Sequence, residues 1–404
     1  MNIPLFSIRS RFLAVLALLA VPPLAPGQGT ITNVRAAQRA ETNLVDIDYD
    51  VTGTTLPLKI TLEVSADDGV TYPIPATAVT GAAGAHVTPG TNLRLTWDAG
   101  KDWGGRFSNT MRYKVVADDA PAAPAGFALI PAGPFQMGDQ SSPLVGNGFE
   151  LPVHTVQVSA FFMGKYEVTK EEWDAVRTWG LANGYTDLLA GNGGYASKGA
   201  NHPVHSITRF DIVKWCNARS QKEGLTPCYT VSGATYKTGS SAPVCNWSAN
   251  GYRLPTEAEW EKAARGGVAG KNFPWGTDTI THSQANYYSA SSYAYDVSPT
   301  RGNHPTYAVG GSPYSSPVGS FAPNGYGLYD MSGNMLEWCW DLSGSYAAGS
   351  QTDPRGAASG SSRVGRGGGW NSNAYACRVA SRGGYAPAGT SYYFGFRPAR
   401  SSVP

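Results

Sequence analysis

Two carboxylates, Asp330 and Glu337, stand at the ends of an octapeptide inside the run GYGLYDMSGNMLEWCWD, residues 325–341. The run is too rich in Gly, Asn and Asp to predict a regular strand or helix, yet its aromatic residues predict burial. A buried irregular backbone must satisfy its carbonyl and amide groups, and a bound hard cation is one way to do so. The carboxylates and the main-chain oxygens of Gly333 and Met335 therefore predict a Ca²⁺ site, whose spacing is not that of an EF-hand. On residue types alone, turn capping or pairing with Arg explains both carboxylates more simply.

Four other motifs accompany this loop along the chain. They are YRLPTEAEWEKAARGG at 252–267, FPWG at 273–276, RGGGW at 366–370 and GFRPAR at 395–400. In this order, and over roughly two thirds of the chain, they resemble the sulfatase-modifying-factor family, which is the family of the formylglycine-generating enzyme. The resemblance implies an α+β fold related to C-type lectins, with little regular secondary structure. It also implies that Asp330, Gly333, Met335 and Glu337 bind calcium, as the matching loop does in that family.

The resemblance implies a second chemistry, which is the copper-dependent oxidation of a substrate Cys to formylglycine by two Cys five residues apart. Here Cys377 stands at the second of these positions, but Ser372 stands at the first, and a hydroxyl does not replace a thiolate as a Cu(I) ligand. Gly369 and Leu336 also depart from the family pattern, which has Ser and Trp at these positions. The sequence therefore predicts that the copper centre is absent. Cys377 is predicted to be a buried residue of a core strand more than a reactive thiol.

Asn286 and Tyr287, in QANYYS, match the start of a second calcium site of that family, formed by an Asn side chain and a main-chain oxygen. An acidic partner downstream would complete the site. Asp296 is the candidate, at an unusual spacing, so the sequence leaves this second ion open.

Three imidazoles raise the question of another metal site. His202 and His205 lie three residues apart in HPVH, and His154 precedes them. The intervening Pro203 and the lack of a third nearby ligand predict that these are structural, hydrogen-bonded residues. The iron-binding pattern H-x3-H-x-E of the family's sulfoxide-synthase relatives does not occur in the chain.

The composition excludes some classes of partner. Of the 404 residues, 42% are hydrophobic and 11% aromatic, which is enough to bury large cores. Gly (49 residues) and Pro (28) are frequent and only 15% of residues are charged, which favours loops and short strands. A net charge of +2 without a basic stripe predicts no nucleic-acid partner.

Residues 1–27 have the pattern of a secretory signal peptide. Arg9 and Arg11 precede the apolar run FLAVLALLAVPPLA, and small residues, Ala25 and Gly27, follow it. The two Pro end the run too early for a membrane anchor. The chain is therefore predicted to be exported, to the periplasm or the extracellular space, with no membrane span after cleavage.

An exported chain meets oxidising conditions, and its five Cys are an odd number. Cys228 and Cys245 lie in two stretches that could form the arms of one hairpin, and they are predicted to form a disulfide. Where members of the resembled family often carry further Cys, this chain has Ala264 and Pro398. Cys216 is therefore predicted to lack its partner.

The elements that position these residues fall into two predicted domains. Residues 28–118 contain short runs that alternate in polarity, such as 45–51 and 58–64, separated by turn signals, and these predict an immunoglobulin-like or fibronectin-like β-sandwich. Residues 119–126 are rich in Ala and Pro and predict a linker. Residues 127–404 then form the predicted sulfatase-modifying-factor domain.

Three helices are predicted in that second domain. Capping boxes place their starts after Thr169, with Glu172, and after Thr256, with Glu259. The third is predicted to run from near Thr208 to residue 220, and the pair Gly266-Gly267 to end the helix that Thr256 begins.

These observations predict two functions of different classes. The first is an exported, calcium-stabilised binding or structural module that presents loops to a protein or carbohydrate ligand. The second is an oxidase that generates formylglycine from a sulfatase cysteine. The intact scaffold motifs and the altered active centre favour the first function over the second.

Overall fold

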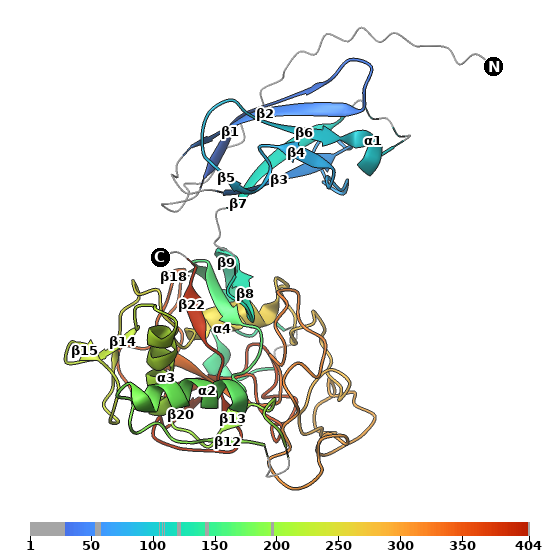
Figure 1. Ribbon diagram of the computed structural model, residues 1–404. Helices are drawn as coiled ribbons and strands as arrows, with labels where there is room; N and C mark the ends of the chain where they lie inside the picture. The colour runs from blue at the N-terminus through green and yellow to red at the C-terminus, as the bar shows by residue number, and fades with distance from the viewer. Residues whose placement is uncertain are drawn as a thin grey trace. The chain divides into compact units, whose positions relative to one another are not determined.

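The structure is a computed structural model that describes residues 29–52, 58–104, 106, 108, 110–118, 123–141, 145–194 and 198–402. The chain divides into two compact units, Met1–Ala120 and Pro121–Pro404 (Figure 1). The predicted signal peptide, residues 1–27, and residues 119–122 of the predicted linker lie outside the described residues.

The first unit contains two antiparallel sheets, in the orders β1-β2-β6-β4 and β5-β3-β7. Alternating apolar residues produce them, because every second side chain of a strand faces the same side. Ile47, Tyr49, Ile60 and Val64 accordingly belong to one buried cluster. The immunoglobulin-like or fibronectin-like identity of this unit stays a prediction. Its elements are β1 (Thr30–Gln38), β2 (Leu44–Thr52), β3 (Leu58–Ser65), β4 (Val79–Gly81), β5 (Gly84–Val87), β6 (Leu93–Asp98), α1 (Ala99–Asp102) and β7 (Arg112–Asp118).

The described residues of the second unit form small sheets of mixed pairing and three α-helices, as expected for the α+β or mostly β class. The sheets have the orders β18-β10-β9, β22-β11-β8, β12-β13, β15-β14-β16 and β20-β19-β17-β21. Their strands are β8 (Phe127–Ile130), β9 (Gly133–Met137), β10 (His154–Val158), β11 (Phe161–Gly164), β12 (Asn192–Gly193), β13 (Val204–His205), β14 (Tyr229–Val231), β15 (Ala234–Thr235), β16 (Val244–Cys245), β17 (Leu336–Leu342), β18 (Gln351–Thr352), β19 (Arg363–Arg366), β20 (Arg382–Tyr385), β21 (Phe394–Gly395) and β22 (Ala399–Ser401).

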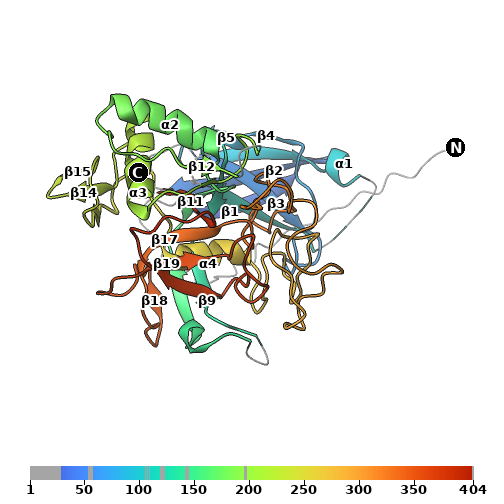
Figure 2. The ribbon, with the colours of Figure 1, turned by 90° about the horizontal axis from the view of Figure 1, so that it is seen from below.

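The helices of this unit are α2 (Lys170–Ala182), α3 (Arg209–Lys222) and α4 (Glu257–Arg265), and a 3-10 turn spans Gly148–Glu150. Each helix begins with a complete capping box, at Thr169, Thr208 and Thr256, and Gly266 ends α4 in the left-handed conformation. These starts and this end confirm the sequence prediction. Helices α2 and α3 pack against each other, and α4 contacts β17 and β19 (Figures 1 and 2).

Aromatic packing holds the domain where regular elements are few. Trp173 of α2 and Trp215 of α3 stack with ring centroids 5.8 Å apart, and Phe396 meets both rings edge-on. Between α4 and β17, residues 266–335 form no helix or strand and contain only isolated bridges. One sequence expectation was wrong here. The run 325–341 does end in a strand, because β17 begins at Leu336 and pairs with both β19 and β21.

Candidate functional site

The loop that enters β17 is held in an unusual backbone conformation. Asp330 and Asn334 have positive φ angles of 56° and 61°, and Gly333 one of 80°. A Cβ at Gly333 would lie 2.3 Å from the carbonyl oxygen of Asn286, so only glycine allows this approach. The main-chain amide of Asn334 donates to that same oxygen at 2.8 Å. The two loops predicted to bind calcium therefore touch each other.

Glu337, the second residue of β17, is fully buried and paired with Arg397. The guanidinium donates to both carboxylate oxygens at distances of 2.6 to 2.9 Å, and the indole Nε1 of Trp260 donates to Oε2 at 2.7 Å. This carboxylate has thus found the Arg partner that residue types alone suggested.

Asp330 is also buried, but only one of its two oxygens has a hydrogen-bond partner. Its Oδ2 accepts from the main-chain amide of Gly319 at 2.7 Å, whereas its Oδ1 is buried and has no hydrogen-bond partner among the described residues. Burial raises the pKa of this carboxyl to about 6. An orphaned carboxylate oxygen in the interior is a site where a cation would be stabilised.

Glu167 joins these two carboxylates, and the sequence analysis missed it. It is fully buried, and it accepts from the Met335 amide at 2.9 Å and from Asn334 Nδ2 at 2.6 Å. Burial, with the charges of Asp330 and Glu337, raises its pKa well above the usual range. Its only signal in the sequence is an acid in the strand-to-helix connection KYEVTK, residues 165–170.

Together these groups form what we call the carboxylate cluster: Glu167, Asp330, Glu337 and Arg397. When ionised, it carries three negative charges against one positive charge, an excess of two. The main-chain carbonyl oxygens of Gly333 and Met335 accept no hydrogen bond from a described amide. No three His, Cys, Asp or Glu side chains of the described chain are arranged to hold a metal by themselves. Any ion here would therefore need carbonyl oxygens as well as carboxylates, as Ca²⁺ does.

At the second predicted ion site, more of the candidate ligand atoms already have hydrogen-bond partners. Asn286 is buried, and its Oδ1 has no partner among the described residues, while its Nδ2 donates to the carbonyl of Tyr314 at 2.8 Å. The carbonyl of Tyr287 contacts His282 Nε2 at 3.1 Å. Asp296, the candidate acid, accepts from the Tyr287 hydroxyl at 2.6 Å and from four other groups, so it organises the loop. The ion stays a prediction here.

The loop of Ser372 and Cys377 carries one thiol. Cys377 is fully buried in a series of turns, not in the core strand that the sequence predicted, and burial raises the pKa of its thiol. Ser372 Oγ accepts from the amide of Gly369 at 3.0 Å. Leu336 is mostly buried as the first residue of β17. The Ser hydroxyl is thus engaged as a turn cap.

The predicted disulfide partners, Cys228 and Cys245, lie where β14 pairs with β16, but their register differs by one residue. Strand β14 pairs with β16 so that Tyr229, not Cys228, stands opposite Cys245. All five Cys are buried free thiols in this structure. In this register Cys228 and Cys245 are not directly opposite each other, although both belong to the same buried cluster. The Cys228–Cys245 disulfide stays a prediction.

The three His residues are each buried and hydrogen-bonded. His154 Nδ1 contacts the carbonyl of Pro152 at 2.9 Å, and His202 Nδ1 contacts Ser315 Oγ at 3.0 Å. His205 Nε2 accepts from the amide of Gly194 at 3.1 Å. Burial lowers the pKa of His202 to about 4.

A cleft of about 940 Å³ lies at the start of α2. Glu171 and Asp174 line one part of it, and Asn192, Lys198 and Tyr392 line others. Tyr392 is half exposed, and its ring packs against Trp370, two residues before Ser372, with centroids 5.8 Å apart. This cleft offers hydrogen-bonding groups and an aromatic face to a ligand.

Comparison with known sequences matches residues 113–402 to the family described as "Sulfatase-modifying factor enzyme 1-like domain". A "Formylglycine-generating enzyme" from Streptomyces coelicolor is 32% identical over 309 residues, which are 70% of this chain and 91% of that protein. The "Chaperone protein LppX" of Paenibacillus barcinonensis is 32% identical over 256 residues, 61% of this chain and 82% of that protein.

Comparison with solved structures gives the same fold. "Treponema denticola variable protein 1" is 29% identical, with a TM-score of 0.52 over 68% of this chain and 94% of that one. CarF is 27% identical, with a TM-score of 0.51 over 69% of this chain and 98% of that one. Separately, no helix in the described parts of the chain is both long and apolar enough to cross a membrane.

Proposed function

The chain belongs to the family of sulfatase-modifying factor enzyme 1-like domains, and from this premise we propose that it is an exported, calcium-stabilised binding or structural module of that family. In this proposal the family's scaffold is kept, and the two-Cys copper centre is not.

The thiol loop carries this proposal. Only one Cys is present where the family's chemistry needs two, and the hydroxyl of Ser372 is held by the amide of Gly369. A soft, two-coordinate Cu(I) site needs two thiolates. Burial opposes the thiolate form of Cys377 as well, because it raises the pKa of that thiol.

The carboxylate cluster supports calcium as the stabilising ion. Its excess of two negative charges matches one divalent cation, and Asp330 Oδ1 and the carbonyl oxygens of Gly333 and Met335 are free to bind it. Because Arg397 already neutralises Glu337, Asp330 and Glu167 supply the uncompensated charge. Calcium would therefore act here by joining the irregular loop to the ends of β17 and β11, not by chemistry on a substrate.

The ligand of such a module is a protein or a carbohydrate. The cleft at the start of α2 suits either class, because it combines carboxylate and amide groups with the half-exposed ring of Tyr392. Relatives that are formylglycine-generating enzymes make a sulfatase one candidate among protein ligands. Conversion of a sulfatase cysteine to formylglycine is the second candidate function, and the retained Cys377 is the observation that favours it.

Copper binding separates the two functions. We expect purified protein to take up no stoichiometric Cu(I) in competition with a chelator, and Cys377→Ser to leave this result unchanged. Ser372→Cys is the matched gain-of-site variant, since it places a second thiol at the family's first position. Tight uptake by the wild type that Cys377→Ser abolishes would instead establish the oxidase as the better function.

A further inference from the structure

A cavity of about 290 Å³ lies under the loop that follows β17, away from the residues of the carboxylate cluster. The start of α4 and the end of β17 line it, together with Met137, His154 and Tyr346. Its mouth is formed by exposed small residues, Ala347 and Ala358 among them. A cavity of this size holds roughly ten water-sized groups.

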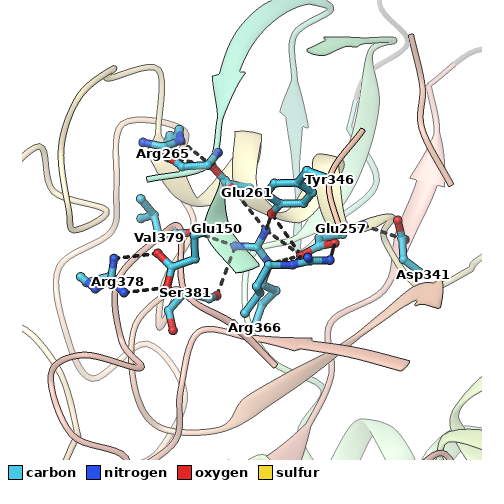
Figure 3. Close-up of polar contacts among 12 residues, drawn as sticks. Glu150, Glu257, Glu261, Arg265, Asp341, Tyr346, Arg366, Arg378, Val379 and Ser381 are labelled. Atoms are coloured by element: carbon cyan, nitrogen blue, oxygen red, sulfur yellow. Dashed lines mark hydrogen bonds and ion pairs between the residues drawn. The ribbon is translucent and has the colours of Figure 1, made fainter. Parts of the chain in front are cut away.

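The charged groups beneath the cavity use almost all of their hydrogen-bonding capacity on one another. Arg382 donates to both oxygens of Glu257 at 2.6 Å, and Arg366 Nε donates to Glu257 Oε1 at 2.9 Å. Figure 3 shows Glu257 between Arg366 and Asp341. Glu257 and Arg382 therefore have no strong interaction left to offer a ligand.

Asp341, in contrast, is partnered on one oxygen only. Its Oδ2 accepts from the main-chain amide of Glu257 at 2.8 Å (Figure 3), and no described residue donates to its Oδ1. The side chain lines the cavity although only 2% of the residue's surface is exposed. One oxygen of this carboxyl group thus stands without a partner in the lining of the cavity.

His154 presents a second free acceptor to the same cavity. A carbonyl oxygen cannot donate, so the 2.9 Å contact with Pro152 assigns the ring proton to Nδ1 and leaves a lone pair on Nε2. No described residue forms a hydrogen bond with Nε2, and His154 is 5% exposed. Gln351 lines the cavity with an amide oxygen that accepts nothing, while its Nε2 donates to the Ala347 carbonyl. Only the Ser345 hydroxyl, among the lining side chains without a partner, can donate.

From these contacts we infer that the cavity binds a primary ammonium group. Apart from the Ser345 hydroxyl, its free side-chain groups are a carboxyl oxygen, an imidazole nitrogen and an amide oxygen, and an ammonium brings three N–H donors and no acceptor. The positive charge would pair with Asp341, which lies beside the negative charge of Glu257. Asp341 keeps its proton up to about pH 8 in the unliganded protein, so the ammonium would bind in exchange for that proton. The three N–H groups of the ammonium would also give hydrogen-bond partners to three cavity acceptors that are costly to leave unpaired in the interior. The ammonium comes either from a small free amine or from a Lys side chain of a partner peptide.

Calorimetric titration of the full chain with n-butylammonium chloride, beside 1-butanol as the neutral probe of similar size, tests this inference. We expect saturable binding of the ammonium and none of the alcohol. Asp341→Asn keeps the acceptor for the Glu257 amide and removes the charge, so binding should weaken about tenfold or more. Asp278→Asn, in a largely exposed ion pair with Lys271 away from both hollows, is the control and should bind as the wild type does.

Two further arms complete the test. Ala347→Trp fills the mouth without touching a buried group and should block binding even if Asp341→Asn fails to fold. A short acetylated peptide with one Lys, compared with butylammonium, distinguishes a partner's side chain from a free amine as the source. The inference is overturned if butylammonium shows no saturable binding to the wild type, or if it binds Asp341→Asn and Ala347→Trp as tightly as the wild type. Equal binding of butanol would also overturn it.

Discussion

Two buried charge clusters of the second domain differ in how completely they are satisfied. Around Arg366, all five N–H groups of one guanidinium are used, by Glu257, by Glu261, by Tyr346 and by the carbonyls of Val379 and Ser381 (Figure 3). In the carboxylate cluster, one guanidinium faces three carboxylates, and Asp330 Oδ1 has no partner. Both clusters are equally buried, so burial does not explain the difference.

The difference separates a structural network from an ion site. A saturated network is self-sufficient, and its value lies in fixing the elements that it joins. A cluster with an excess of two negative charges and a free oxygen is stable only if it holds protons or a cation. The comparison therefore predicts opposite responses to added metal and to the loss of single charges.

The largest expected effect follows from breaking the saturated cluster. Arg366→Met keeps an unbranched apolar stem but leaves Glu257 and Glu261 buried without this guanidinium, which should destabilise the fold by about 3–5 kcal/mol. Urea unfolding followed by Trp fluorescence measures this, and Ca²⁺ should not restore the loss.

Lys271→Met is the matched control, because the ion pair of Lys271 with Asp278 is largely exposed. It should change stability by less than about 0.5 kcal/mol. An Arg366→Met protein as stable as this control would mean that the saturated cluster is not a structural network.

The second effect concerns the unsaturated cluster. Calcium at a hundredfold excess over its Kd should stabilise the wild type by about 2.7 kcal/mol, seen as a melting temperature several degrees above that in EGTA. Asp330→Asn should lose most of this response while remaining as stable as the wild type in EGTA, because the Asn oxygen still accepts from Gly319 and one repulsive charge is gone. Differential scanning calorimetry measures both values.

Glu337→Gln is a less specific probe of the same site. It should lower the melting temperature with and without calcium, since Glu337 also accepts from Arg397 and Trp260. If the wild type melts at one temperature in Ca²⁺ and in EGTA, the cluster binds no calcium, and its charges are balanced by protons alone.

The third expected effect is a pH dependence at the edge of the saturated cluster. Burial, with the charge of Glu257, raises the pKa of Asp341 from 3.8 to about 8. Between these values the unfolded chain has lost a proton that the folded protein keeps, so the free energy of unfolding falls as pH rises. This contribution is complete below pH 3.8 and lost above about pH 8.

One proton limits the slope to about 1.4 kcal/mol per pH unit. Asp341→Asn cannot titrate, so its stability should fall less steeply than that of the wild type across this range. Urea unfolding at a series of pH values compares the two slopes, and parallel curves would show that Asp341 does not keep its proton in the folded state.

Local signals made much of the fold predictable from sequence. Thr169 and Thr256, each with an acid three residues on, marked helix starts correctly because a capping box is complete within four residues. The alternation in 45–51 predicted a strand for the same local reason. Asp330 and Glu337 could be chosen as candidate ligands because they share one motif with Gly333 and Met335.

Contacts across long separations were not predictable. Glu167 lies 167 residues before Asn334, its partner in the carboxylate cluster, and nothing near it in sequence marks it as a member. Glu337 finds Arg397 60 residues later, and that pairing decides which carboxylate stays free. The cavity of Asp341 and His154 depends on a fold that brings β10 beside β17 and α4, so a single sequence gave no sign of it.

The contact between Gly333 and Asn286 has a consequence for how the two loops respond to ligands. The amide of Asn334 is bonded to the Asn286 carbonyl, and Gly333 allows the two loops to approach closely. A shift of one loop therefore either breaks this bond or displaces the other loop. A ligand that binds one loop more tightly in one position of the pair must change the affinity of the other loop for its own ligand. That second ligand then changes the affinity for the first by the same factor, as thermodynamic reciprocity requires. The glycine therefore makes the pair one cooperative unit.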